Sequence, residues 1–63
     1  MVYKKVTIWF KSNESVIAEN YERTMVSVSG DYLILSIHNQ DSTEVTTQVH
    51  HFSTIKNWKT YLN

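Results

Sequence analysis

Hydrophobic and polar residues alternate in the first segment of the chain, Val2 to Lys11. Val6, Ile8 and Phe10 occupy every second position, and polar or amphipathic residues stand between them. This period of two is typical of a half-buried strand, because successive side chains of a strand point to opposite faces. The polar residues Ser12 to Ser15 that follow have the composition of a turn. We therefore expect a strand over Val2 to Lys11.

The next segment, Val16 to Tyr21, fits two structures. As a helix, it would place Ile17, Tyr21 and Met25 on one face at the spacing i, i+4, i+8. As a strand, it would follow a two-residue turn at positions 13 and 14. That turn would set Phe10 opposite Ile17 and Val6 opposite Tyr21. We favour the strand and keep the helix as the alternative.

A hairpin is the clearest pattern of the chain, with strands over Thr24 to Ser29 and Tyr32 to His38. Gly30 and Asp31 stand between them, and Gly followed by Asp is a favoured hairpin loop because Gly tolerates a positive φ. This loop fixes a register in which all the hydrophobic pairs share one face. The expected pairs are Val28 with Leu33, Val26 with Leu35, and Thr24 with Ile37.

A turn at Asn39 to Ser42 precedes a further predicted strand, Thr43 to Phe52. Val45 and Val49 should lie on the same face as the apolar residues of the preceding strand, which requires Ile37 to pair with Val45. An odd loop, either of three residues at positions 40–42 or of five, would give this pairing. An even loop would turn both valines outward, and we reject it because it would leave them unburied.

The end of the chain has helical spacing. Ile55, Trp58 and Leu62 fall at i, i+3, i+7, Ser53 is a suitable N-cap, and Phe52 precedes it as a hydrophobic staple. A helix of about ten residues is marginal alone, so we expect it to dock on the apolar sheet face. The predicted fold is mainly β, a β-rich α+β single domain over residues 1–63. It is a four- to five-stranded antiparallel meander or small open barrel with a short C-terminal helix.

The composition fits a small domain with a thin core. The chain has 63 residues, of which 41% are hydrophobic, with no Cys, no Pro and a single Gly. The lack of Cys excludes disulfides and Cys-based zinc sites, and a single Gly excludes a phosphate-binding loop of the P-loop or dinucleotide type. No segment has the pattern of a signal peptide or a membrane span, so we expect a cytoplasmic protein. In size and composition the chain resembles small accessory proteins of phages and other mobile elements, a resemblance that rests on no motif and transfers no residue.

The His and Asp residues do not form a pattern typical of catalysis or metal binding. His50 and His51 are adjacent, and neighbours on a strand point to opposite faces. His38 lies too far along the neighbouring predicted strand to join either of them. Asp31 and Asp41 fall in predicted turns at opposite ends of one strand. We therefore expect no enzyme, no metal site and no cofactor.

The sheet face opposite the predicted core combines large apolar side chains with Lys, although a face exposed to water should be polar. Its residues are Tyr3, Lys5, Trp9, Lys11, Met25, Tyr32 and Ile34. The sheet could curl and bury these residues. The face could instead bind protein, since Trp, Tyr and Met are typical interface anchors, or it could be a stacking platform for single-stranded nucleic acid.

The net charge of the chain favours protein binding over nucleic-acid binding. Six basic residues balance six acidic ones, whereas proteins that bind phosphates usually carry a basic excess. We therefore predict a non-enzymatic interaction module that binds an unidentified protein partner or forms a homodimer, through this face or through a strand edge, and that has no membrane partner. The alternative is weak binding of single-stranded nucleic acid through Tyr3, Lys5, Trp9, Lys11 and Tyr32.

Overall fold

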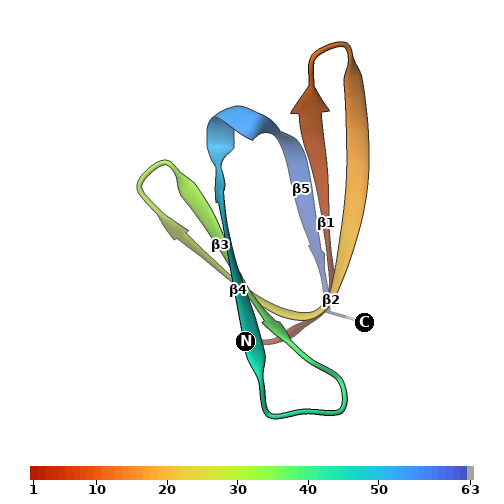
Figure 1. Cartoon of the computed structure of the whole chain (residues 1–63), viewed down its shortest axis with the longest axis vertical. Coiled ribbons are helices and arrows are strands. Elements are labelled where there is room, and N and C mark those ends of the chain that lie inside the picture. The colour runs from red at the N-terminus through yellow and green to blue at the C-terminus, as the bar shows by residue number, and fades with distance from the viewer. Residues whose placement is uncertain (63) are drawn as a thin grey trace.

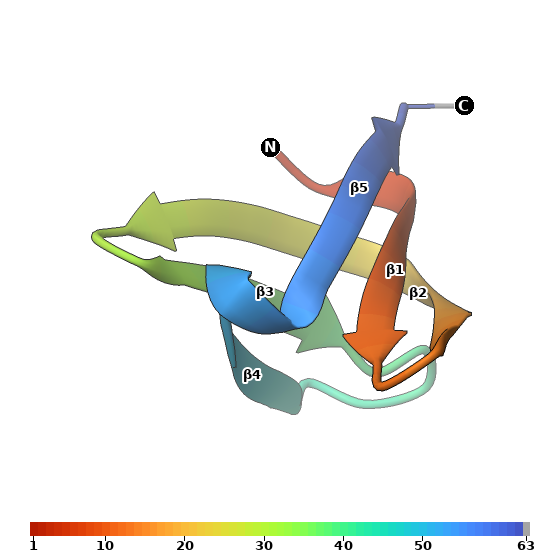
Figure 2. The same cartoon turned by 90° about the horizontal axis from the view of Figure 1, so that it is seen from above.

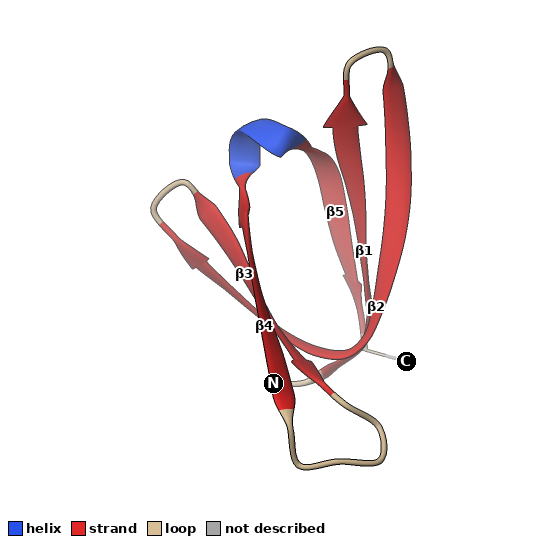
Figure 3. Cartoon of the chain, viewed as in Figure 1, coloured by secondary structure: helices blue, strands red, loops and turns tan. Residues whose placement is uncertain are grey.

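The computed structural model describes residues 1–62 and contains five antiparallel strands and one short 3-10 turn (Figures 1 and 3). In chain order the elements are β1 (Tyr3–Ser12), β2 (Ser15–Ser29), β3 (Tyr32–His38), β4 (Val45–His51), η1 (Phe52–Thr54) and β5 (Ile55–Tyr61). The strands form one open sheet in the order β4-β3-β2-β1-β5, so β4 and β5 are its edges. The expectation of a mainly β antiparallel fold is confirmed.

The long strand β2 carries the bend of the sheet. It pairs with β1 as far as Thr24 and with β3 from Thr24 onward. Arg23, just before this change of partner, has a φ of 47°, in the left-handed region that non-glycine residues rarely adopt. Figure 2 shows β2 curving from the β1 side of the molecule to the β3 side. The bend divides the sheet into two halves, β5-β1-β2 and β2-β3-β4.

The core lies on the inner face of the bent sheet and is small. Val6, Ile8, Leu33 and Leu35 are fully buried, and Ile55 is nearly so. Partly buried side chains surround these five, namely Tyr3, Phe10, Tyr21, Val26, Ile37, Phe52 and Trp58. Both halves of the sheet therefore contribute to one hydrophobic cluster.

The first two hairpins have the registers that the sequence predicts. Residues 16–21 are strand, not helix, and Phe10 lies opposite Ile17 as expected, with Val6 opposite Tyr21. In the second hairpin Gly30 has a φ of 57°, the left-handed conformation that makes glycine suitable for this turn. Its predicted register is confirmed at all three pairs, which are Val28 with Leu33, Val26 with Leu35, and Thr24 with Ile37.

The predicted register of β4 is wrong. Ile37 pairs with Thr46, not with Val45, and the loop over residues 39–44 has six residues, an even number. Gln48 and His50 consequently face inward. Burial of these two polar side chains is tolerated because His50 Nε2 and Gln48 Oε1 hydrogen-bond to each other at 2.9 Å. The His50 ring also lies 5.0 Å, centroid to centroid, from the ring of Phe10.

The predicted C-terminal helix is also wrong, since only the 3-10 turn at Phe52–Thr54 is helical and β5 follows it. The expected N-cap, Ser53, lies inside this turn, which His51 caps by accepting the Ser53 N–H at Nδ1 (3.1 Å). A β-bulge explains the misleading spacing. Phe10 pairs with Ile55 and Trp9 pairs with Asn57, so Lys56 is an extra residue.

Because of this bulge, Ile55 and Trp58 share the inner face of a strand although they are three residues apart. Same-face residues of a regular strand are two apart, whereas a separation of three is typical of a helix. The bulge thus gives Ile55 and Trp58 the three-residue spacing of a helix although both lie in a strand. Leu62, the last residue of the predicted apolar stripe, lies beyond β5 and is exposed.

Candidate functional site

The bend separates the predicted binding residues into two groups. Lys5, Trp9 and Lys11 alternate with the core residues of β1 and therefore lie on the outer face of the β5-β1-β2 half. Met25, Tyr32 and Ile34 lie on the outer face of the β2-β3-β4 half, as follows from their pairing beside the inward residues of β3. Tyr3 belongs to neither group, because it is half-buried and packs against the core.

An apolar surface covers the outer face of the β2-β3-β4 half. It consists of Met25, Tyr32, Ile34, Val45 and Val49. Ile34 and Val49 are directly paired, and the other three residues lie in neighbouring rows of the same face. Exposed fractions are 41% for Met25, 47% for Tyr32, 48% for Val45 and 57% for Val49. The bend and the outward register of β4 thus collect large exposed apolar side chains on three adjacent strands.

The two β4 valines were missed as surface residues because the sequence argument assigned them to the core. The competing signal was present in the sequence, since Gln48 and His50 alternate with Val49. Either set could face inward, and the valines were chosen on hydrophobicity alone. The loop decides the matter, because the Asn39 N–H donates to the Glu44 carbonyl at 3.2 Å and so closes an even loop.

The two edges of the sheet differ in how they are protected against pairing with another strand. β5 carries Lys56 and Lys59 and contains the bulge, and these features hinder the pairing of an edge strand with a further strand. β4 has the sequence VTTQVHH, with no Lys, Arg, Asp, Glu or Pro, and no register shift interrupts its pairing with β3. The backbone groups of β4 that face away from β3 are therefore a regular and uncharged edge.

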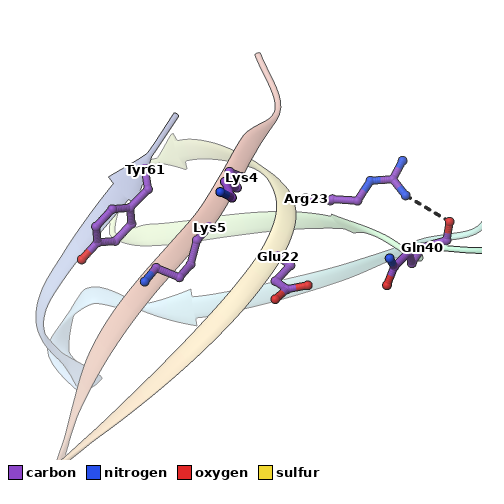
Figure 4. A pocket seen from close by; sticks show the side chains of 6 residues that line it. All are labelled: Lys4, Lys5, Glu22, Arg23, Gln40 and Tyr61. Atoms are coloured by element: carbon purple, nitrogen blue, oxygen red, sulfur yellow. Dashed lines mark hydrogen bonds between the residues drawn. The ribbon is translucent and has the colours of Figure 1, made fainter. Parts of the chain in front are cut away.

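A second candidate surface lies on the other half of the sheet, where β1 pairs with β5. Lys5 Nζ lies 4.3 Å from the centroid of the Tyr61 ring, and Lys59 Nζ lies 5.0 Å from it. Beside this cluster is a shallow hollow of about 380 Å³ (Figure 4). Its lining residues are Lys4, Lys5, Glu22, Arg23, Gln40 and Tyr61. Of these, only Lys5 was among the residues singled out from the sequence.

Titratable groups on both faces of the sheet form local hydrogen bonds. Tyr21 Oη donates to Glu19 Oε2 at 2.5 Å. Burial, and then this bond and the charge of Glu19, raise the pKa of the Tyr21 phenol well above its usual range. His51 Nδ1 lies 2.8 Å from Ser53 Oγ. The first pair lies within β2 and the second where β4 meets η1, so the two pairs do not form one cluster.

No group of three or more His, Asp or Glu side chains in residues 1–62 is arranged to hold a metal ion. His38 Nε2 is buried and has no hydrogen-bond partner. His38 pairs with Val45 across the strands, and one ring nitrogen of each of the other two His residues takes part in the bonds described above. The part of the chain that the structure describes also has no helix of the length and apolar character that a membrane crossing requires.

Compared with known proteins, the chain matches no protein-family model, no curated protein and no solved structure.

Proposed function

We propose that this chain is a non-enzymatic protein-interaction module and that its partner is a second copy of itself, paired through the edge of β4. The observation that carries the proposal is the contrast between the two sheet edges. Proteins usually protect exposed edges with Lys, Pro or bulges, because an unpaired strand recruits other strands. β5 has such protection and β4 has none.

The β4 strand is suited to antiparallel pairing with itself. A two-fold axis at Gln48 would set Thr47 of each copy opposite Val49 of the other, with both residues on the outer face. The same β4 residues of each copy would then contact one another across the axis, which is the arrangement of an isologous interface. The zero net charge of the chain leaves no long-range repulsion between the copies.

Sedimentation velocity over a concentration series tests this proposal. We expect the wild-type protein to sediment as a species of twice the 7.4 kDa monomer mass at high concentration. The variants Val49→Lys and Thr47→Lys place a cation on the exposed edge and should sediment as monomers. Both positions are exposed, so the variants should keep the amide spectrum of a folded protein.

The matched control is Val16→Lys, which makes the same substitution at another exposed strand valine, in the β1–β2 hairpin. It should leave the dimer intact. A wild-type protein that stays monomeric throughout the series would refute the proposal. Equal disruption by Val16→Lys and Val49→Lys would also contradict it, because the interface would then not lie at β4.

A further inference from the structure

The net charge of the chain is zero, but most of its cationic side chains lie on one part of the surface. The chain has six cationic side chains. Three of them, Lys4, Lys5 and Arg23, line the hollow. Lys59 lies against the ring of Tyr61, and Tyr61 is also a lining residue of the hollow. Lys11 follows on the outer face of β1. Lys56, the extra residue of the bulge, neither lines the hollow nor lies against Tyr61.

The carboxylates are mostly elsewhere. Glu22 lines the hollow, and Asp41 follows Gln40 in the loop at its far end. Glu14 and Asp31 occupy the turns of the two hairpins, Glu44 lies at the end of the β3–β4 loop, and Glu19 is bonded to a tyrosine of the inner face. The outer face of the β5-β1-β2 half is therefore locally basic, so the neutral total does not describe the field that a ligand meets there.

Several N–H donors line the hollow. Lys4 and Lys5 come from β1, and Arg23 comes from the bend of β2 (Figure 4). Arg23 Nη1 donates one hydrogen bond to the Gln40 carbonyl at 3.1 Å, which holds the side chain beside the hollow. A guanidinium has five N–H donors, so others remain for an anionic oxygen. A phosphate group is the ligand that matches these cations.

An aromatic side chain continues this basic surface along β1. Trp9 is half-buried, lies outside the core cluster, and has Lys11 two residues further along the same face. Its cross-strand neighbours, Ala18 and Asn57, are too short to cover an indole ring. From Lys4 to Lys11 the strand rises about 23 Å, at roughly 3.3 Å per residue. Cations thus stand on both sides of an indole over the length of a short oligonucleotide.

We infer that this basic face, consisting of Lys4, Lys5, Trp9, Lys11, Arg23, Lys59 and Tyr61, binds single-stranded nucleic acid. The cations contact the phosphates, and Trp9 stacks on a base, which is the way that sequence-tolerant single-strand binders work. A duplex does not fit this role, because its bases are stacked inside and do not reach the indole. The basic face is separate from the β4 edge, so the inference does not depend on the proposed dimer.

Fluorescence anisotropy tests the inference with a fluorescein-labelled, mixed-sequence DNA strand of about 12 nucleotides, a length within the range that single small barrels bind. We expect saturable binding at low salt that weakens steeply as salt is added. The double variant Lys5→Gln/Lys59→Gln should weaken binding about tenfold and reduce the slope of log K against log[salt] by about 1.4, or 0.7 for each lost phosphate contact.

Lys56→Gln is the matched control, since it removes the cation that stands outside the basic face. It should change the affinity by less than about twofold and leave the salt slope unchanged. Trp9→Ala should weaken binding about tenfold through the loss of stacking. Lys5 and Lys59 lie outside the core cluster, so the lysine variants test the inference even if Trp9→Ala disturbs the fold.

Three results would overturn the inference. These are the absence of saturable binding at low salt, an equal loss of affinity in Lys56→Gln and in the double variant, and competition by polyglutamate as strong as that by unlabelled DNA. The third result would show a general anion site with no role for the bases. Val49→Lys should bind the strand as the wild type does, which separates this result from the outcome for the dimer.

Discussion

Truncation of Leu35 tests the position of the core most severely. This side chain is fully buried on β3, between Val26 on one neighbouring strand and Gln48 on the other. Leu35→Ala removes three carbon atoms, which corresponds to about 2.4 kcal/mol at 0.8 kcal/mol per buried methylene. The cavity left behind adds to this loss, and we expect a total of about 3 kcal/mol.

A loss of this size is large for so short a chain. At 0.05–0.15 kcal/mol per residue, a protein of 63 residues has a free energy of unfolding of about 3–9 kcal/mol. Urea denaturation followed by far-UV circular dichroism measures the change. With an m value of about 1 kcal/mol/M, the midpoint of Leu35→Ala should fall by about 3 M or the variant should be unfolded without urea.

Val49→Ala is the matched comparison on the adjacent strand. Val49 is 57% exposed, so its truncation should change the free energy of unfolding by less than about 0.5 kcal/mol. The titration is made at low protein concentration, where self-association does not contribute to stability. If Val49→Ala destabilises the protein as much as Leu35→Ala does, β4 is shifted by one residue and the register described above is incorrect.

Two further substitutions and one deletion test particular features of the fold. Gly30→Ala should destabilise the protein by about 1 kcal/mol, because φ is +57° at this position, although no atom lies within 4 Å of the added carbon. Thermal denaturation measures this loss of stability, and an unchanged melting temperature would contradict the prediction. Tyr21 has a phenol pKa raised above its unfolded value, so the neutral phenol stabilises the fold below about pH 10 and this contribution is lost as the pH rises further. Tyr21→Phe should therefore lose less stability above that pH than the wild type, as urea titrations on both proteins will show, and equal alkaline losses would refute the argument. Deletion of Lys56 should remove the bulge yet keep Ile55 and Trp58 on the inner face, with a loss of about 1 kcal/mol; an unfolded spectrum would show that the bulge is required.

The sequence predicted the parts of the fold in which a short turn connects two patterned strands. Gly30 and Asp31 determine a two-residue loop, and a loop of known length leaves one register that places Val26 and Leu35 together. The turn at positions 13 and 14 acts in the same way for β1 and β2. In both hairpins the local chemistry and the burial pattern favour the same pairing.

The sequence failed where loop length and local irregularity determine the structure. The six-residue loop before β4 is closed by backbone hydrogen bonds that the residue pattern does not predict. Val45 and Val49 were therefore assigned to the wrong face. The single extra residue Lys56 gave β5 the spacing of a helix. Bulges of this kind are set by the pairing of two strands, and a single strand read alone does not reveal them.

The error at the bulge and the unrecognised bend at Arg23 explain why the basic face was only partly predicted. With the last segment read as a helix, Lys59 and Tyr61 had no place beside Lys5. Arg23 belonged to no predicted element, and its left-handed φ, which marks the bend that splits the outer face in two, is not visible in the sequence. Lys5 and Trp9 were found because β1 is regular, and its alternation assigns their faces directly.

The pairing of β4 with a second copy is most directly tested by nuclear Overhauser effects measured in a mixed sample of ¹³C-labelled and unlabelled protein. An isotope-filtered experiment on this sample detects only contacts between copies. We predict intermolecular contacts between the methyl groups of Val49 and Thr47, together with contacts across the edge near Gln48. A dimer whose intermolecular contacts lie on β5 or on the β1–β2 hairpin, or a sample that shows none, would contradict the account.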